Sequence, residues 1–208
     1  RLKGDRFSHY NEKDNLSYRL YLKDSEKIFG LRKFSLQKPR MRNYIHEWVF
    51  HKLISETDLI NIKYEFIELS VNGSNSSLYN IEEGFDKILI ERNKRRNGPI
   101  FSLQEELSAK FHDSNFEIYN KSFWLSSEHI IFTDSVRAKL EKFRDGGLEA
   151  NDIFDIDKWA KFFAITDLNY YSHATAAKSV RFYYNPVSAL FEPIGYDAHR
   201  GVPNYSKY

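Results

Sequence analysis

The chain has 208 residues, 41% of them hydrophobic and 16% aromatic, which excludes a disordered chain and favours one well-packed globular domain. Its 31 basic and 29 acidic residues leave a formal net charge of +2, so no overall field favours nucleic acid or an anionic membrane surface as a partner. The chain has no cysteine, which excludes disulfides and thiol nucleophiles, and no apolar run is long enough to span a membrane.

The first third of the sequence predicts two pairs of antiparallel strands. Residues 17–22 (SYRLYL) and 32–37 (RKFSLQ) alternate between apolar and polar side chains and form the first pair. Residues 62–73 and 76–83 form the second pair, and Asn72-Gly73 is a strong turn signal between them.

A helix is predicted between the two strand pairs, over residues 38–56, with Pro39 suited to its start. The apolar residues at helical spacing, which we expect to form its buried face, are Ile45, Trp48, Val49 and Leu53. Glu47 falls on the opposite side, between Phe50 and Ile54. Two interpretations have equal weight: a partly exposed glutamate, or a salt bridge to a cation of the neighbouring sheet. The candidate cations are Lys33, Lys38 and Arg19.

From Gly84 onward the apolar spacing becomes helical. The predicted helical segments are 84–93, 102–111, 133–143 and 155–172, with breaks at Asn97-Gly98-Pro99 and Gly146-Gly147. Two short runs, 180–185 and 190–197, then predict a hairpin. The predicted fold class is α+β, with an N-terminal antiparallel sheet that carries one helix and a mainly helical C-terminal lobe.

The last long helix, which begins after Asp155, ends on an acid. Ile156, Ala160, Phe163 and Asp167 lie nearly on one line of its surface. Asp167 either faces solvent where the helix frays, or is held at the edge of the core with Asn169 as a second polar group. The pattern alone gives these two interpretations equal weight.

Other charged and metal-binding motifs give less support to a function. The basic run Arg92, Lys94, Arg95 and Arg96 favours a solvated helix end over contact with nucleic acid. The seven histidines include no pair at the spacing of a zinc site. Asp197, in FEPIGYDAHRG, is by its neighbours either a turn residue or a ligand.

Taken in order, a series of segments resembles the CotH family of spore-coat protein kinases over nearly the whole chain. The segments are RLKGD, SYRLYL, KFSLQKPRMRNYIHEW, VNGSNSSLYNIEE, NGPIFSL, TDLN and RFYYNPVSALFEPIGYD. The resemblance implies one atypical two-lobed kinase domain over 1–208, with an N-lobe at about 1–83 and a C-lobe at about 84–208. The chain starts with Arg1, which suits a segment of a longer protein.

The resemblance also implies an activity and its cofactors. A CotH-like phosphotransferase uses ATP and Mg²⁺ and transfers the γ-phosphate to Ser or Thr of a protein substrate, here a spore-coat or cell-envelope protein. Such a reaction needs positioning and charge neutralisation rather than covalent chemistry from the protein. Carboxylate and amide oxygens are suitable ligands for Mg²⁺.

Three polar residues carry the catalytic and metal roles that the resemblance implies. Asp167 of TDLN matches the acid that accepts the proton of the substrate hydroxyl, and Asn169 helps to hold the metal. Asp197 of EPIGYD matches the acid that binds Mg²⁺ and bridges it to the phosphates.

Five further residues are implied at the nucleotide. Glu47 resembles the helix glutamate that pairs with a phosphate-binding lysine, for which Lys33 is the first candidate and Lys38 the second. Tyr79 and Glu83 fall near the hinge between the lobes, where the adenine or ribose would lie.

The sequence departs from the family pattern around Asp197. Gly195 stands where a tryptophan is usual, and His199 stands in place of a second acid. The sequence leaves two alternatives to a protein kinase, the first of which these departures support. One is a catalytically impaired pseudokinase that acts as a binding or structural module of a spore coat or cell envelope. The other is a metal-dependent hydrolase of phosphate esters.

Overall fold

The computed structural model describes residues 2, 16–23, 26–103 and 115–198. The predicted helix at 102–111 lies outside these residues for most of its length, and His199 lies outside them too. Within the described ranges, no helix has the length and apolar content needed to cross a membrane.

The N-terminal sheet is antiparallel, with strand order β1-β2-β5-β4, as the alternation predicted. Its strands are β1 (Tyr18–Tyr21), β2 (Lys33–Gln37), β4 (Tyr64–Leu69) and β5 (Ser77–Glu83). The β1–β2 turn includes Gly30 at φ 80°, and the β4–β5 turn includes Asn72 and Gly73 at φ 53° and 76°. Asn and Gly tolerate this left-handed conformation better than other residues, which fixes both turns.

The helical region after β2 is split in two. Pro39 begins the 3₁₀ helix η2 (Pro39–Arg42), and α1 (His46–Ser55) follows after two residues with positive φ. The predicted buried face of α1 is wrong: Ile45 is 55% exposed, and the buried residues are instead Glu47, Phe50, His51 and Ile54.

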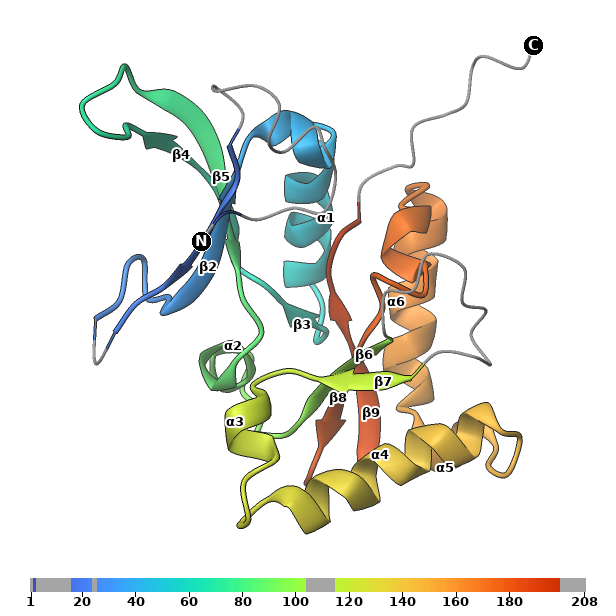
Figure 1. The fold of residues 1–208 in the computed structure, drawn as a ribbon. Coiled ribbons are helices and arrows are strands. Elements are labelled where there is room, and N and C mark those ends of the chain that lie inside the picture. The colour runs from blue at the N-terminus through green and yellow to red at the C-terminus, as the bar shows by residue number, and fades with distance from the viewer. Residues whose placement is uncertain (1, 3–15, 24–25, 104–114, 199–208) are drawn as a thin grey trace.

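The reason for the different buried face is the position of α1 between two layers. Figure 1 shows α1 between β5 of the first sheet and α6 (Ile156–Leu168). Phe50 and Ile54 approach the backbone of Gly195, where a Cβ would lie only 3.2 Å from Phe50 Cε1. The absent side chain at Gly195 therefore lets the Phe50 face of α1 pack closely on the second sheet.

The second sheet has the strand order β3-β9-β8-β6-β7, with β3 parallel to β9 and the other pairs antiparallel (Figure 1). Its strands are β3 (Ile60–Asn61), β6 (Ile100–Leu103), β7 (Phe116–Ile118), β8 (Arg181–Asn185) and β9 (Leu190–Gly195). The β8–β9 hairpin was predicted, whereas β3, β6 and β7 were not. Four of these strands follow Gly84, so the C-terminal part mixes helices with a sheet and is not clearly mainly helical.

The helices after β5 pack against the second sheet. They are α2 (Lys87–Arg92), α3 (Lys121–Trp124), α4 (Ile130–Arg144), α5 (Ala150–Ile153), α6 and the 3₁₀ helix η4 (Ser172–Thr175). Asp155 caps α6 by accepting a hydrogen bond from the Lys158 amide, and Trp159 Nε1 donates to the Phe191 carbonyl of β9 at 2.9 Å. The described residues therefore form a mixed α+β fold with two sheets. The α+β class was predicted, whereas the second sheet was not.

Candidate functional site

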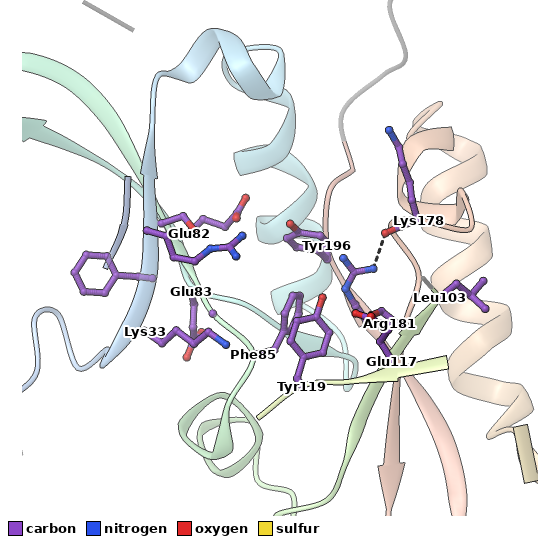
Figure 2. A pocket seen from close by; sticks show the side chains of 15 residues that line it. Lys33, Glu82, Glu83, Phe85, Leu103, Glu117, Tyr119, Lys178, Arg181 and Tyr196 are labelled. Atoms are coloured by element: carbon purple, nitrogen blue, oxygen red, sulfur yellow. Dashed lines mark hydrogen bonds between the residues drawn. The ribbon is translucent and has the colours of Figure 1, made fainter. Parts of the chain in front are cut away.

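A pocket of about 330 Å³ lies where the two sheets meet (Figure 2). Both sheets and the segments that follow β5, β7 and β9 contribute its lining. The lining residues that matter most for its charge and shape are Lys33, Glu82, Glu83, Phe85, Tyr119 and Arg181. Lys33 and Glu83, for which the resemblance implies contacts with a nucleotide, both line this pocket.

Arg181, at the start of β8, is a buried cation that forms no salt bridge with the described residues. The residue is only 7% exposed, and its guanidinium carbon lies 5.4, 5.6 and 4.7 Å from the ring centroids of Phe85, Tyr119 and Tyr196. Nη1 donates to the Lys178 carbonyl at 2.7 Å, whereas Nε is buried and has no hydrogen-bond partner within the described chain. Rings and carbonyl groups thus hold the guanidinium, and no carboxylate of the described residues forms a salt bridge with it.

Lys33 is the second such cation. Its Nζ lies 5.7 Å from the ring centroids of both Tyr21 and Tyr119, and the described residues offer it no salt bridge. Burial lowers the pKa of Lys33 and Arg19 reinforces this shift, whereas the nearby Tyr21 and Asp86 oppose it. The lysine stem crosses Gly84, where a Cβ would lie 2.6 Å from Lys33 Cγ. A glycine is needed here because any side chain would displace the lysine.

The buried acids that line the pocket are already bound to groups of the fold. Glu82 Oε2 accepts hydrogen bonds from Gln37 Nε2 at 2.8 Å and from Arg42 Nη2 at 3.0 Å. Glu83 accepts one from the Lys63 amide at 2.7 Å and forms a salt bridge with Arg92. Burial raises the pKa of Glu83, and Arg92 opposes that shift. A third acid of the lining, Glu117, is about half exposed and lies 3.5 Å from Lys121 Nζ. The lining charges that form no salt bridge with the described residues, Lys33 and Arg181 among them, are therefore positive.

Asp197, the predicted Mg²⁺ ligand, is surrounded by hydrogen-bond donors and lies outside the pocket lining. Its Oδ1 accepts from Arg42 Nη1, and its Oδ2 accepts from Ser179 Oγ at 2.8 Å and lies 3.0 Å from His173 Nδ1. Arg42 also binds Glu82, so its guanidinium joins the end of β9 to β5. Burial would lower the pKa of Arg42, but Glu82 and its other neighbours outweigh burial and raise it.

Mg²⁺ does not fit this arrangement. Both oxygens of the Asp197 carboxylate are engaged by side-chain donors, and the positive charge of Arg42 lies against one of them. The part of the chain that the structure describes brings no three His, Asp or Glu side chains together in a group that could hold a metal ion. A divalent cation at Asp197 would have to displace the guanidinium, which is already neutralised there.

Asp167 and Asn169 are not brought to this pocket. Asp167 is exposed on α6, so the solvent-facing interpretation of the helix end is the one observed. The buried residues of α6 are Trp159, Phe162 and Thr166, whereas Phe163 of the predicted stripe is 44% exposed. Asn169 Nδ2 donates to the Ile165 carbonyl at 2.8 Å and so terminates the helix.

The salt bridge predicted between Glu47 and Lys33 or Lys38 is not formed by these described residues. Glu47 is fully buried, and its Oε1 lies 3.2 Å from His51 Nε2, one turn further along α1. Lys38 Nζ instead lies 4.4 Å from the ring centroid of Tyr79, so these two predicted nucleotide contacts face each other and do not line the pocket. The salt bridge predicted for Glu47 is not observed because α1 directs this side chain into the interior between the layers, where it lies beside His51.

Sequence reasoning also missed Arg42 and Arg181 and misjudged Gly195. The available signal for Arg181 was an arginine inside the aromatic strand RFYYN. An arginine is rarely buried unless a partner neutralises its charge. A tryptophan at position 195 would point toward Phe50 of α1, and the neighbouring Tyr196 presents its ring to the pocket instead.

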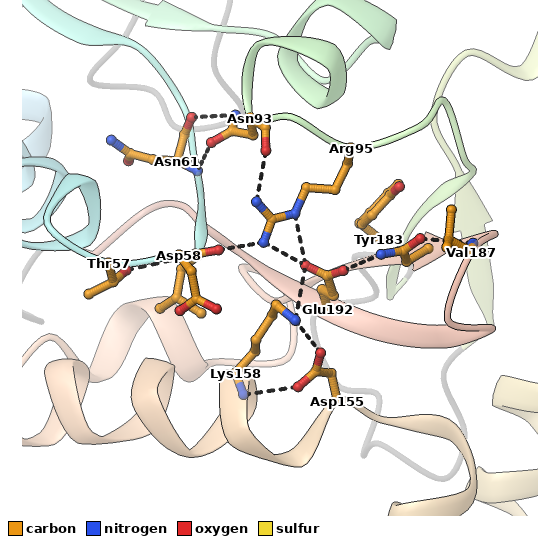
Figure 3. Close-up of polar contacts among 12 residues, drawn as sticks. Thr57, Asp58, Asn61, Asn93, Arg95, Asp155, Lys158, Tyr183, Val187 and Glu192 are labelled. Carbon is orange, nitrogen blue, oxygen red and sulfur yellow. Dashed lines mark hydrogen bonds and ion pairs between the residues drawn. The ribbon is translucent and has the colours of Figure 1, made fainter.

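A second cluster of charges joins β9, α6 and the segment after α2 (Figure 3). Glu192, which is 1% exposed, accepts hydrogen bonds from Arg95 Nε at 3.1 Å and from Asn185 Nδ2 at 2.7 Å. Arg95 Nη1 also donates to the Asn93 carbonyl at 2.7 Å, and Lys158 Nζ lies 3.9 Å from Glu192. Arg95 is therefore not part of a solvated helix end, as was predicted for the basic run, but binds other parts of the fold.

Comparisons with known proteins give no family for the chain: no protein-family model matches it, and a search of curated proteins found no significant match. The functional assignment therefore depends on the geometry of the pocket and on the residues around Asp197.

Proposed function

We propose that the chain is a non-catalytic, kinase-like binding module, a CotH-like pseudokinase that takes an anionic ligand in the pocket between its two sheets. The observation that carries this proposal is the carboxylate of Asp197, which Arg42, Ser179 and His173 surround with donors. An acid held in this way stabilises the fold and has no free oxygen for a metal.

The position of the other predicted catalytic acid supports the same proposal. Phosphoryl transfer requires a group that orients the acceptor hydroxyl within hydrogen-bond reach of the ligand. Asp167 is exposed on α6 and is not among the residues of the pocket. The phosphotransferase activity that the family resemblance implies would therefore require Asp167 to reach the pocket and Asp197 to give up its side-chain donors for a metal.

Two features support a kinase-like arrangement of the pocket. A sheet with one helix precedes a larger part with its own sheet and helices (Figure 1). The pocket is lined by residues of both parts (Figure 2). Lys33 on β2 and Glu83 at the end of β5 line it, the positions that the resemblance assigns to phosphate binding and to the hinge. Ligand pockets commonly lie at such junctions.

The test is a phosphoryl-transfer assay with γ-labelled ATP and Mg²⁺, general protein acceptors and the chain itself. The Asp167→Asn variant is the matched control, because it removes the carboxylate without changing the side-chain volume. We expect neither labelled protein nor released phosphate above the level of this variant. Labelled protein in the wild type alone would show a kinase, and released phosphate without labelled protein would favour the phosphate-ester hydrolase.

A further inference from the structure

We infer that the pocket is a metal-independent diphosphate site, in which Lys33 and Arg181 bind the phosphate oxygens of a small ligand from opposite walls. This inference rests on the proposed function and deepens it by naming the ligand's chemistry and the residues that hold it. The diphosphate group could belong to a nucleotide or be inorganic, and the experiment below separates these sources.

The first argument is the charge of the pocket. Lys33 and Arg181 both line it and neither has a salt bridge within the described ranges, whereas the buried Glu82 and Glu83 are bound to Arg42 and Arg92. Buried charges in folded proteins are normally paired, because desolvation of an isolated charge is costly. An anionic ligand would supply the partner that the fold does not.

The second argument is the geometry of the two cations. Lys33 Nζ and the Arg181 guanidinium carbon lie 5.7 and 5.6 Å from the centroid of the same ring, that of Tyr119. Figure 2 shows their side chains on opposite walls, with Phe85 and Tyr119 between them. A ligand with two phosphates offers an anionic group to each cation, which a single carboxylate does not. Arginine favours such ligands because its planar fork matches phosphate oxygens.

The third argument is that Arg181 is held in place before any ligand binds. Three aromatic rings surround its guanidinium within 6 Å, and the Lys178 and Val180 carbonyls fix Nη1 at 2.7 and 2.9 Å. Little side-chain entropy would be lost on binding, because the rotamer is already fixed. Burial disfavours the charged form of Lys33, so a bound anion would restore the favourable state of that ammonium group.

Independence from metal follows from Arg42. Its guanidinium forms a salt bridge with the Asp197 carboxylate, so a side chain neutralises the acid that would hold Mg²⁺ against the phosphates. Lys33 and Arg181 then provide the positive charge that a metal would otherwise provide. Because Mg²⁺ in solution competes for the same phosphate oxygens, the metal should leave the affinity unchanged or weaken it.

The experiment is isothermal titration calorimetry with ADP and with inorganic pyrophosphate, each in EDTA, and with ADP in excess Mg²⁺. The variants are Lys33→Met and Arg181→Gln. Arg137→Gln is the matched control, since Arg137 lies on α4, outside the pocket lining, and its Nε is likewise buried without a hydrogen-bond partner. Circular dichroism and thermal unfolding confirm that each variant folds.

We expect wild type and Arg137→Gln to bind in EDTA with equal affinity, and each pocket variant to bind at least about tenfold more weakly, the loss typical of a charged hydrogen bond. Equal affinities for ADP and pyrophosphate would support the diphosphate alone as the ligand, whereas tighter binding of ADP would support a nucleotide. Binding of ADP only with Mg²⁺, unchanged affinity in Arg181→Gln, or no binding of either probe would overturn the inference. The transfer assay described above tests the proposed function independently, because it measures phosphate transfer to protein and the calorimetry measures ligand affinity.

Discussion

Arg95 and Arg181 are two largely buried arginines at the β8–β9 hairpin with different partners. Arg95 is bound to the carboxylate of Glu192 at 3.0 Å and to backbone carbonyls, as Figure 3 shows. Arg181 is bound to three rings and two carbonyls, and no acid of the described chain forms a salt bridge with it. The charge of Arg95 is neutralised by a carboxylate of the fold, whereas no carboxylate of the described residues neutralises that of Arg181.

This is the difference that we expect between a structural charge and a ligand-binding one. Both guanidinium groups are desolvated, so burial alone does not distinguish them. The cluster around Glu192 contains cations and acids together and lies outside the pocket, whereas the uncompensated charge of Arg181 faces the pocket. A buried cation is therefore a candidate for ligand binding when it lines a pocket and its expected partner is absent.

Removal of the acid from the satisfied cluster should have the largest effect. Glu192→Ala leaves Arg95 buried without its carboxylate, which we expect to cost about 3–5 kcal/mol of unfolding free energy. Urea unfolding followed by tryptophan fluorescence measures the change. A loss below about 1 kcal/mol would show that the cluster is less important than its burial indicates.

Gly84→Ala tests how closely Lys33 is positioned. The new methyl group would lie 2.6 Å from Lys33 Cγ and 3.0 Å from the Lys33 carbonyl oxygen, so the lysine must move. We expect a loss of about 1–3 kcal/mol in unfolding free energy, the usual effect of overpacking. Pyrophosphate binding should weaken as well. Gly146→Ala is the control, because a substitution there meets no neighbouring atom within 4 Å but has the backbone strain of a positive φ. Equal pyrophosphate binding in the Gly84 variant and wild type would contradict the role of Lys33.

Arg181→Met should change stability less than Glu192→Ala does. The variant loses two hydrogen bonds to carbonyls and the contacts with the rings, but it also removes a buried charge without an acid. We expect these effects to cancel to within about 1 kcal/mol, as measured by the same urea unfolding. A loss as large as that of Glu192→Ala would identify Arg181 as a structural cation and remove the contrast with Arg95.

The smallest effect concerns the pH dependence of Lys33. Its pKa in the folded chain is lowered from 10.5, chiefly by burial, so between the lowered pKa and 10.5 the unfolded chain holds a proton that the folded chain has released. Stability from this group therefore rises with pH through that window and is constant below it. Thermal unfolding from about pH 8 to about pH 10 should show this rise in wild type and not in Lys33→Met. An equal dependence of stability on pH in both proteins would contradict the lowered pKa of Lys33.

The strands of the first sheet and the last hairpin were predictable from the sequence, whereas β3, β6, β7 and the packing of the layers were not. Alternation and the Asn72-Gly73 turn predicted the N-terminal strands, and the 180–185 and 190–197 runs predicted the last hairpin. The orientation of α1 was predicted wrongly because the helix has apolar residues on two sides, and periodicity does not show which layer lies against which side. Its buried Phe50 face depends on Gly195, nearly 150 residues away in the chain.

The candidate site was predictable only in part. The family resemblance implied Lys33 and Glu83 at a ligand, and both line the pocket. Asp167 and Asp197 were expected to converge on a metal, but the residues that surround Asp197 come from η2, η4 and the segment after η4. Arg181 was missed because its role depends on rings from three separate segments, which no local pattern brings together.

The most direct test of the metal-independent diphosphate site is a crystal structure of the chain with ADP in the presence of EDTA. We expect diphosphate oxygens within about 3 Å of both Lys33 Nζ and the Arg181 guanidinium, with Arg42 still bound to Asp197. A diphosphate bound away from these two cations would contradict the account. So would a parallel crystal grown with Mg²⁺ in which the metal binds Asp197 and displaces Arg42.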